Sequence, residues 1–510
     1  MKKRLKRVIR FLTYLLIFIA VLIVYSTKWS QVTYGNIQIE EILFYLTVPL
    51  QGTEKGLLVS FIKKSLMPTI IEATVINILV SILFKKMDNN DLLIKLKVFK
   101  KSIELQLNSI LVKTLTILFL LVIGFLEIRS CFNTLNINTY LKNQINDSTF
   151  IEENFIDPKE VKLTFPEKKR NLIYIFVESL ESNYQSKTKS GEYDNAIKEL
   201  YDLAHENTNF SDNDDVGGAT QVSYLSWTTA GMVAQTSGIP FKVEAEITNG
   251  GQLSTMLLGD YTIGEILKEQ GYNLEFMCGS DAKFGNRETF LKNHGNYNIY
   301  DYYSAIKNNK IPEDYLEWWG FEDSKLFEYA KEEITNLSKK EEPFNFSMLT
   351  ANTHHIDGYV EKDCDEKYNT NYDNAVACSS RQIYDFVKWI QEQDFYDNTT
   401  IVISGDHLGM DPSLYEGDDI IDLANRRVLD IIINSTKDNN NTKNRVFTTM
   451  DLFPTTLAAL GVDIDGDKMA LGVNLYSDKK TLLEEYGTDY VDQEFKKKSK
   501  FYNNKILKEE

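Results

Sequence analysis

The first 130 residues hold long apolar runs, the second of which is weakened by Glu72 and Asn77, whereas the rest of the chain alternates short apolar runs with polar stretches. Three long runs approach the ~20 apolar residues that a bilayer-spanning helix needs; they are residues 8–27, 66–84 and 108–126. A signal peptide would have a shorter apolar core and a small-residue cleavage site, so we interpret the first run as an uncleaved helix. Segment 42–50 is too short to span, and we expect it at the membrane interface or against the other helices.

Lysine and arginine residues predict how these helices are oriented. The chain begins MKKRLKR, and the loop 85–101 carries six further lysines. Loops rich in Lys and Arg stay on the cytoplasmic side of a membrane. Both basic segments are cytoplasmic if the first two apolar runs each cross the bilayer. The third run then crosses from the cytoplasmic to the extracytoplasmic side. We therefore predict a multi-pass protein of the cell membrane, with everything after about residue 130 on the extracytoplasmic face.

The later part of the chain has the pattern of a soluble α/β domain. Five short, nearly continuous apolar runs predict strands buried on both faces: 171–179, 273–280, 344–352, 399–407 and 428–434. Helical patterns at 261–271 and 379–393 lie between them. This alternation predicts a mostly parallel sheet flanked by helices. We place a membrane domain at 1–130, a linker at 131–167, the α/β domain at 168–485, and a charged tail expected to fray at 486–510.

Charge and cysteine content narrow the possible partners. The 510-residue chain has a net charge of −17. This balance argues against nucleic acid as a partner, because phosphate contacts need clustered Lys and Arg. None of the four cysteines forms a C-x-x-C pair, which makes a structural zinc site improbable. Cys364 and Cys378 bracket a short polar stretch; outside the cytoplasm they are expected either to pair or to remain two thiols.

Ionisable residues follow several of the predicted strands. Glu178 ends the first run, Asp406 and His407 end the run at 399–407, and His354 follows the run at 344–352. Ligand sites of open α/β sheets lie beyond the carboxyl ends of the strands. Carboxylates and imidazoles together suit manganese, magnesium or zinc. Taken singly, Glu178 is more often a helix cap and the Asp-His pair is as often a surface turn.

The segment TQVSYLSWTTAGMV at 220–233 places a hydroxyl pair, Thr228 and Thr229, before an apolar helical pattern. A threonine is a weak nucleophile unless a base or metal activates it. If Glu178, Asp406 and His407 held a metal, a hydroxyl at a helix N-terminus would be placed to join it, and the helix N–H groups would attract an anion. The alternative is that Thr228 only caps the helix.

Five segments, in order, resemble the sulfatase/alkaline-phosphatase superfamily, and within it the membrane-bound phosphoglycerol transferases that decorate periplasmic glucans or synthesise lipoteichoic acid. The resemblance covers about residues 168–480. It rests on NLIYIFVESLE (171–181), WTTAGMVAQTSGIP (227–240), LTANTHHIDGY (349–359), TIVISGDHLGM (400–410) and TTMDLFPTTLAALG (448–461). It implies an α/β/α sandwich with a mixed sheet, placed here after N-terminal transmembrane helices.

The resemblance also implies site residues. One divalent ion, Mn²⁺ or Mg²⁺ with Zn²⁺ as a further option, would be bound by Glu178, Asp406 and His407. Thr228 would be the nucleophile and would also contact the metal, with Ser226 and Thr229 as rival hydroxyls. The resemblance assigns substrate contacts to two further residues, His354 and Arg287. The tryptophan that the family has near this arginine has no obvious counterpart in this sequence.

The implied reaction transfers glycerophosphate from phosphatidylglycerol through a glycerophosphoryl-threonine. The acceptor would be an envelope glycan or a growing polyglycerolphosphate chain. The alternative within the fold is a phosphoethanolamine transferase or another phosphotransferase or hydrolase. A sulfatase activity is disfavoured, because residue 228 is Thr and no C-x-P-x-R-type motif follows. An inactive scaffold is a third class, against which the intact set Glu178, Thr228, Asp406 and His407 argues.

Overall fold

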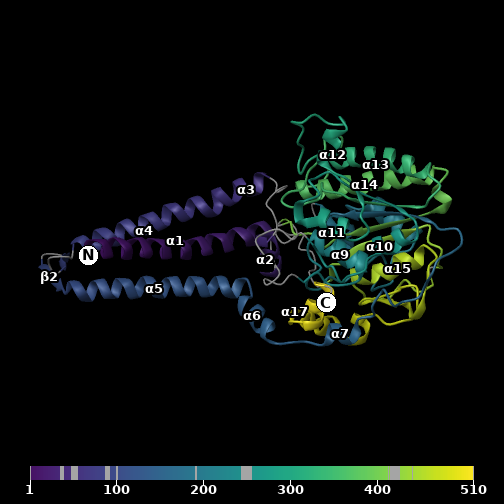
Figure 1. Ribbon diagram of the computed structural model, residues 1–510. Helices are drawn as coiled ribbons and strands as arrows, with labels where there is room; N and C mark the ends of the chain where they lie inside the picture. The colour runs from purple at the N-terminus through teal and green to yellow at the C-terminus, as the bar shows by residue number, and fades with distance from the viewer. Residues whose placement is uncertain are drawn as a thin grey trace. The chain divides into compact units, whose positions relative to one another are not determined.

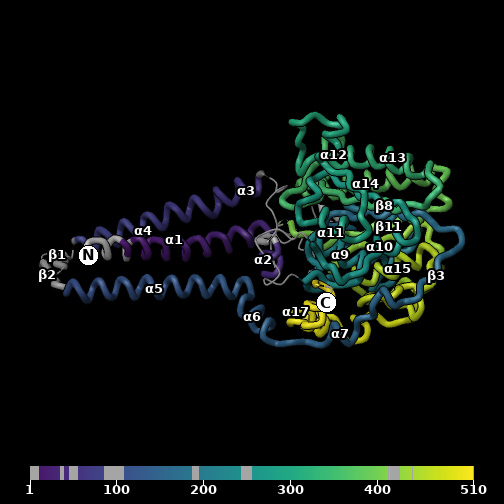
Figure 2. The backbone as a smooth tube through the Cα atoms, viewed as in Figure 1, coloured from purple at the N-terminus to yellow at the C-terminus, as the bar shows by residue number. Residues whose placement is uncertain are grey.

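The computed structural model describes residues 2–34, 39–47, 55–86, 92–98, 101–189, 192–242, 255–411, 413, 425–438 and 440–508 (Figures 1 and 2). The chain forms two compact units. The first comprises Met1–Ile39 and Glu54–Tyr140, and the second comprises Glu40–Thr53 and Leu141–Glu510. All of residues 168–485, where the sequence predicts the α/β domain, therefore fall in the second unit, together with one short segment from the N-terminal region.

The first unit consists mainly of apolar helices. Its elements are α1 (Lys2–Tyr34), α3 (Lys55–Phe61), the π-helix η1 (Ile62–Leu66), α4 (Met67–Lys86), β1 (Leu92–Val98), β2 (Lys101–Leu107) and α5 (Ser109–Thr134). Within the described residues, three helical stretches are long and apolar enough to cross a membrane: Phe11–Tyr34, Gly56–Lys85 and Ser109–Thr134. Each overlaps one of the predicted spans. The lysine-rich segment between the second and third stretches contains the antiparallel pair β1–β2, which the sequence pattern did not predict.

A seven-stranded mixed sheet forms the centre of the second unit, in the order β7-β12-β11-β4-β10-β8-β9. The strands are β4 (Asn171–Val177), β7 (Gly218–Ala219), β8 (Asn273–Cys278), β9 (Asn298–Tyr300), β10 (Phe344–Leu349), β11 (Thr399–Gly405) and β12 (Val428–Ile433). All five predicted strands are present. The consecutive strands β11, β4, β10, β8 and β9 all run parallel to one another. Strand β12 runs antiparallel to both of its neighbours, β11 and β7. The expected mixed sheet is thus confirmed.

Alternate residues of the central strand β4 face two separate hydrophobic cores. Leu172, Tyr174 and Phe176 belong to one core, and Ile173, Ile175 and Val177 belong to the other. The first core includes apolar side chains of α9 (Thr228–Ser237), α10 (Ile263–Glu269) and α15 (Leu452–Ala459). The second includes those of α8 (Lys198–Glu206), α13 (Asp323–Ser338) and α14 (Asn371–Gln391). Helices therefore cover both faces, as in an α/β/α sandwich (Figure 1).

Short elements complete the described part of the chain. The helices are α2 (Ile39–Thr47), α6 (Ile137–Ile145), α7 (Phe150–Asn154), α11 (Arg287–Asn293), α12 (Tyr302–Lys307), α16 (Leu482–Tyr486), α17 (Thr488–Lys496) and the π-helix η10 (Tyr502–Ile506). The strands are β3 (Leu163–Thr164), β5 (Lys187–Lys189), β6 (Glu192–Asp194), β13 (Asp463–Ile464), β14 (Lys468–Met469) and β15 (Gly472–Val473). The 3₁₀ helices are η2 (Ser182–Ser186), η4 (Phe284–Asn286), η5 (Tyr396–Asn398), η8 (Thr449–Asp451) and η9 (Asp465–Asp467).

Two segments are more ordered than the sequence pattern predicted. The region expected to be a linker contains α6, α7 and β3, and the tail expected to fray forms α17 and η10. The physical reason in the tail is a pair of apolar residues on one helical face, Val491 and Phe495, at the i,i+4 spacing of a buried stripe. Both side chains are fully buried in the first core, together with Phe150 of the linker region.

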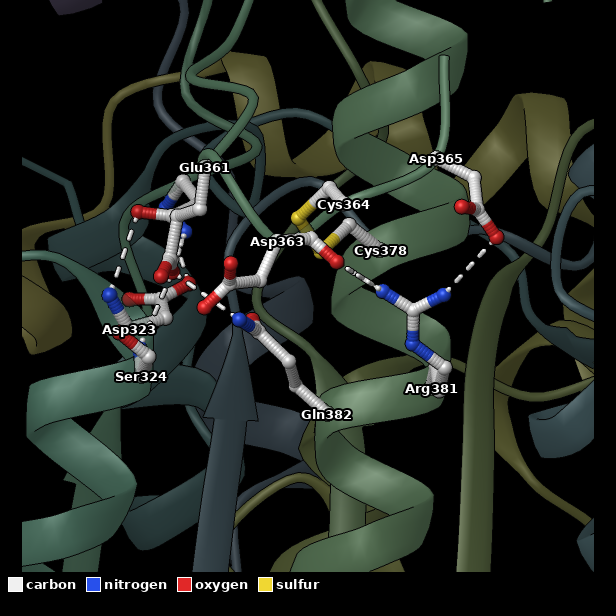
Figure 3. The surroundings of a disulfide bond; sticks show 10 residues. Asp323, Ser324, Glu361, Asp363, Cys364, Asp365, Cys378, Arg381 and Gln382 are labelled. Atoms are coloured by element: carbon white, nitrogen blue, oxygen red, sulfur yellow. Dashed lines mark hydrogen bonds and ion pairs between the residues drawn. A yellow bond between two sulfur atoms is a disulfide. The ribbon is translucent and has the colours of Figure 1, made fainter. Parts of the chain in front are cut away.

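A disulfide joins Cys364 to Cys378, with Cα atoms 5.5 Å apart, and closes a loop before α14 (Figure 3). Arg381, three residues after Cys378 on the same helix, donates to the carbonyl of Asp363 at 3.2 Å and pairs with Asp365 at 3.4 Å. The sequence left open whether these two cysteines pair. The structure resolves this question in favour of the disulfide.

Candidate active site

Strand pairing brings the predicted acidic residues together at one edge of the sheet. In the parallel pair β11–β4, Gly405 lies opposite Val177. The first residues after these two strands are Asp406 and Glu178, so the register places their backbones side by side. The Asp406 N–H donates to the Val177 carbonyl at 3.1 Å, which extends the ladder by one bond.

Glu178, Asp406 and His407 form a buried cluster. His407 Nε2 lies 3.3 Å from Glu178 Oε1 and 3.5 Å from Asp406 Oδ2. One potential ligand atom from each residue lies within 4.8 Å of the others. Asp406 Oδ1 accepts from the Ser179 and His407 N–H groups, both at 2.8 Å. Asp406 Oδ2 is buried and has no hydrogen-bond partner among the described residues. This orphaned oxygen and the hard donor set fit a divalent cation.

The charges in this cluster depend strongly on one another. Burial, reinforced by the charge of Glu178, raises the pKa of Asp406 to about 7. Burial also works to raise the pKa of Glu178, but His354 and His407 outweigh it and hold that pKa below its ordinary value. Burial lowers the pKa of His407, but the two carboxylates raise it by more. The net result is a pKa of about 10. The two carboxylates therefore favour a positive charge between them, which is the electrostatic requirement of a cation site.

Thr228 is the first residue of α9, and its side chain reaches the cluster. Its Oγ1 donates to Glu178 Oε2 at 3.3 Å. The N-cap position of α9 belongs to Trp227, so Thr228 does not occupy the capping position that was the alternative interpretation. Of the two rival hydroxyls, Thr229 donates to the Gly285 carbonyl at 2.9 Å. Ser226 Oγ is buried without a hydrogen-bond partner in the part of the chain that the structure describes.

Close packing fixes α9 against the strand that carries the metal-ligand candidates. A Cβ atom added to Gly231 would lie 2.0 Å from the carbonyl oxygen of Asp406, so only glycine permits this approach. One turn further on, Gln235 donates to the Gly405 carbonyl at 2.8 Å and accepts from the Tyr174 hydroxyl at 2.9 Å. These contacts join α9 to β11 and β4, and they set where Thr228 lies relative to the cluster.

A pocket opens beside Thr228 and contains both of the predicted substrate-binding residues. Its lining consists of Glu178, Thr228, Thr229, Ser280, Phe284, Arg287, Trp319, Leu349, Thr350, Ala351 and His354. Arg287 is held in place by bonds from Nη2 to Ser280 Oγ (2.9 Å) and to the Asp281 carbonyl (2.8 Å). Burial lowers the pKa of His354, although the charge of Glu178 opposes this shift. The pocket thus places a guanidinium and an imidazole beside the threonine hydroxyl.

Two residues near the site were not identified from the sequence. Trp319 lines the pocket, with its ring centroid 4.6 Å from that of His354 and 5.1 Å from that of Phe284. Trp319 and Arg287 thus line the same pocket although they are 32 positions apart in the chain. The double tryptophan in EWWGF was the available sign of this residue in the sequence. Trp319 Nε1 is buried and has no hydrogen-bond partner among the residues described. Glu41, in α2, is buried in the second unit, and His407 contributes to the electrostatics of its carboxyl.

The sandwich, its mixed sheet and the cluster at its carboxyl edge define a domain of the alkaline-phosphatase and sulfatase class. The sulfatase family model matches residues 170–462, more than half of the chain, and the chain belongs to this family. The fold class inferred from the sequence is thereby confirmed. Its architecture is three membrane-capable helices followed by a sulfatase-like α/β/α domain.

Curated relatives include phosphoglycerol transferase I of Salmonella choleraesuis (strain SC-B67) and of Salmonella typhimurium (strain LT2). Each is 30% identical over 352 residues, which is 68% of this chain and 44% of the relative. The chain thus spans less than half the length of the curated relatives that it matches.

Two solved structures illustrate the structural similarity. The lipoteichoic acid synthase LtaP from Listeria monocytogenes is 17% identical, with a TM-score of 0.46, over 65% of this chain and 82% of that one. The lipooligosaccharide phosphoethanolamine transferase EptA from Neisseria meningitidis is 13% identical, with a TM-score of 0.49, over 88% and 84%.

Proposed function

We propose that the protein is a metal-dependent phosphotransferase that moves glycerophosphate from phosphatidylglycerol to an envelope glycan or a polyglycerolphosphate chain. The observation that carries the proposal is the position of Thr228 Oγ1, 3.3 Å from Glu178 in a cluster suited to a cation and beside a pocket that contains Arg287. The 30% identity to proteins named phosphoglycerol transferase I supports the choice of transferred group.

Glu178, Asp406, His407 and Thr228 are the residues proposed to hold the ion, which is Mn²⁺ or Mg²⁺, with Zn²⁺ as a further option. Zinc is included because carboxylate and imidazole ligands together also suit this ion. When bound, such an ion would lower the pKa of the threonine hydroxyl and offset charge on the phosphoryl group.

The reaction is proposed to proceed in two displacements at phosphorus. In the first, a bond forms between Thr228 Oγ1 and phosphorus, the bond to diacylglycerol breaks, and the threonine proton ends on the released diacylglycerol. In the second, an acceptor hydroxyl oxygen bonds to phosphorus, the bond to Oγ1 breaks, and the acceptor proton returns to Thr228. Arg287 and His354 would contact the phosphoryl oxygens, where negative charge develops, and the N–H groups at the start of α9 would add to this effect.

The proposed location is the extracytoplasmic face of the cell membrane, with three crossings before the catalytic domain. The basic N-terminus and the basic loop 85–101 support this orientation. The Cys364–Cys378 disulfide supports it independently, because disulfides persist mainly in oxidising compartments. Membrane attachment would hold the enzyme at the leaflet that contains its donor lipid.

Lipid product analysis tests the donor and separates the two phosphotransferase alternatives. Purified full-length protein with Mn²⁺ would be incubated with labelled phosphatidylglycerol or labelled phosphatidylethanolamine. We expect diacylglycerol from phosphatidylglycerol, its loss in Thr228→Ala, and its retention in Thr229→Ser as the matched control. Diacylglycerol released only from phosphatidylethanolamine would instead establish the phosphoethanolamine transferase.

A further inference from the structure

The short helix α2 lies in the chain between the first two membrane-capable helices, yet from Glu40 onward it belongs to the same compact unit as the sulfatase domain. Glu40, Glu41 and Phe44 are 9%, 2% and 0% exposed. Their spacing places these three side chains on one face of the helix. This face is buried even though α2 lies far outside the residues that the family model matches.

Phe44 packs into an aromatic cluster that includes the residue before the proposed nucleophile. Its ring centroid lies 5.9 Å from that of Trp227 and 5.3 Å from that of Phe241, the second contact being edge-on. Trp227 and Phe241 are themselves 6.0 Å apart. Nearby, Glu40 Oε1 accepts from the Tyr224 hydroxyl at 3.3 Å. The buried face of α2 therefore contacts the segment 224–241 at three of its residues.

Trp227 depends on packing for its position. Its backbone is extended, and Thr228 immediately after it begins α9. Its side chain is 1% exposed, and its Nε1 has no hydrogen-bond partner among the described residues. Within the described residues, its ring contacts are those with Phe44 and Phe241, and this packing holds the indole. A shift of this indole would move the start of α9 and the hydroxyl of Thr228 with it.

We propose that α2 is a positioning element of the active site, in which Phe44 holds Trp227 and so fixes Thr228 Oγ1 relative to Glu178. This assignment rests on the proposed role of Thr228 as nucleophile.

Three variants of the full-length protein in lipid nanodiscs test the proposal. Phe44→Ala removes the ring, Phe44→Leu retains most of the apolar volume, and Ile42→Ala alters a residue of α2 outside the buried face. We expect Phe44→Ala to slow formation of the Thr228 adduct by ~10- to 100-fold, because a displacement of ~1 Å costs that order of rate. KM for the donor lipid and the affinity for Mn²⁺ should change less than about twofold. Phe44→Leu should recover most of the rate, and Ile42→Ala should match the wild type.

Hydrogen exchange provides a readout that needs no substrate. In Phe44→Ala, peptides within 224–237 should exchange faster, whereas those of strands β4 and β11 should be unchanged. A wild-type adduct rate in Phe44→Ala, or unchanged exchange in 224–237, would overturn the proposal. Faster exchange throughout the domain would also overturn it, since Phe44 would then serve general stability. If the wild type formed no adduct with any phospholipid, the proposed function would fail, and the exchange comparison would still decide the role of α2.

Discussion

Replacing Gly231 with alanine should separate Thr228, the proposed nucleophile, from the metal-ligand candidates without changing any polar group. Gly231 lies one turn after Thr228 in α9, and its Cα faces the backbone of Asp406. The added Cβ would stand 2.0 Å from the Asp406 carbonyl oxygen and 2.7 Å from its carbon. Ordinary contact begins at 3.4 Å, so α9 and the segment that contains Asp406 after β11 must move apart by about 1.4 Å.

The size of the effect follows from this displacement. Overpacking a well-packed interior costs typically ~1–3 kcal/mol of unfolding free energy. A misplacement of about 1 Å in a reacting group can lower a rate by ~100-fold. We therefore expect Gly231→Ala to be moderately destabilised and to form the Thr228 adduct about 100-fold more slowly, because Thr228 Oγ1 and Asp406 lie on the two elements that are forced apart.

The assay is single-turnover adduct formation, normalised to the fraction of protein that is folded. Gly264→Ala, in α10, is the matched control, because its Cβ would meet the Tyr297 ring at 2.6 Å and the His294 carbonyl at 2.7 Å. This control should lose stability to a similar extent while its folded fraction keeps the wild-type rate. A folded Gly231→Ala protein that reacts at the wild-type rate would refute the argument that this contact positions Thr228.

Three further outcomes are expected from residues around the sheet. Cys364→Ser should lower the unfolding free energy by about 3 kcal/mol, as expected for the loss of a crosslink that closes a loop of this length. In denaturant titrations, a reductant should lower the stability of the wild type but not that of the variant. Trp319→Ala should raise KM for the donor lipid by about tenfold, equivalent to ~1.4 kcal/mol, with Trp319→Phe retaining part of the affinity; an unchanged KM would show that the ring does not contact the donor. Burial raises the pKa of Asp430 to about 8, so the stability that its protonated form contributes is present at pH 4 and is lost as pH rises through 8. Asp430→Asn should accordingly show a shallower fall in unfolding free energy over that interval, and parallel curves would contradict this account.

Residues that follow strongly patterned strands were predictable from the sequence. Glu178 and Asp406 each come directly after a run of apolar residues, and parallel strands end at a common edge. The apolar pattern therefore predicts that both carboxylates lie at the edge of the sheet, whereas their meeting was implied by the family resemblance and follows in the structure from the register of β11 and β4. The reversed direction of β12 and the two-residue strand β7 were not predicted, because hydrophobic periodicity does not encode strand direction and two residues are too few to show a period.

Contacts that depend on tertiary packing were beyond the sequence pattern. Trp319 reaches the pocket from a segment with no regular periodicity. The sequence pattern therefore did not indicate that Trp319 and Arg287 line the same pocket. Phe44 belongs to a segment that composition assigned to the membrane region, whereas its ring packs against Trp227. The pairing of Cys364 and Cys378 was likewise undecidable, since only the distance between the two backbones determines whether the bond forms.

Peptide mass spectrometry after incubation with phosphatidylglycerol and Mn²⁺ measures the central claim most directly. The account predicts a glycerophosphate adduct on the residue 228 side chain, absent from Thr228→Ala and removed when an acceptor is added. An adduct on Ser226 or Thr229, or a protein that turns over the lipid with no covalent adduct on any residue, would contradict it.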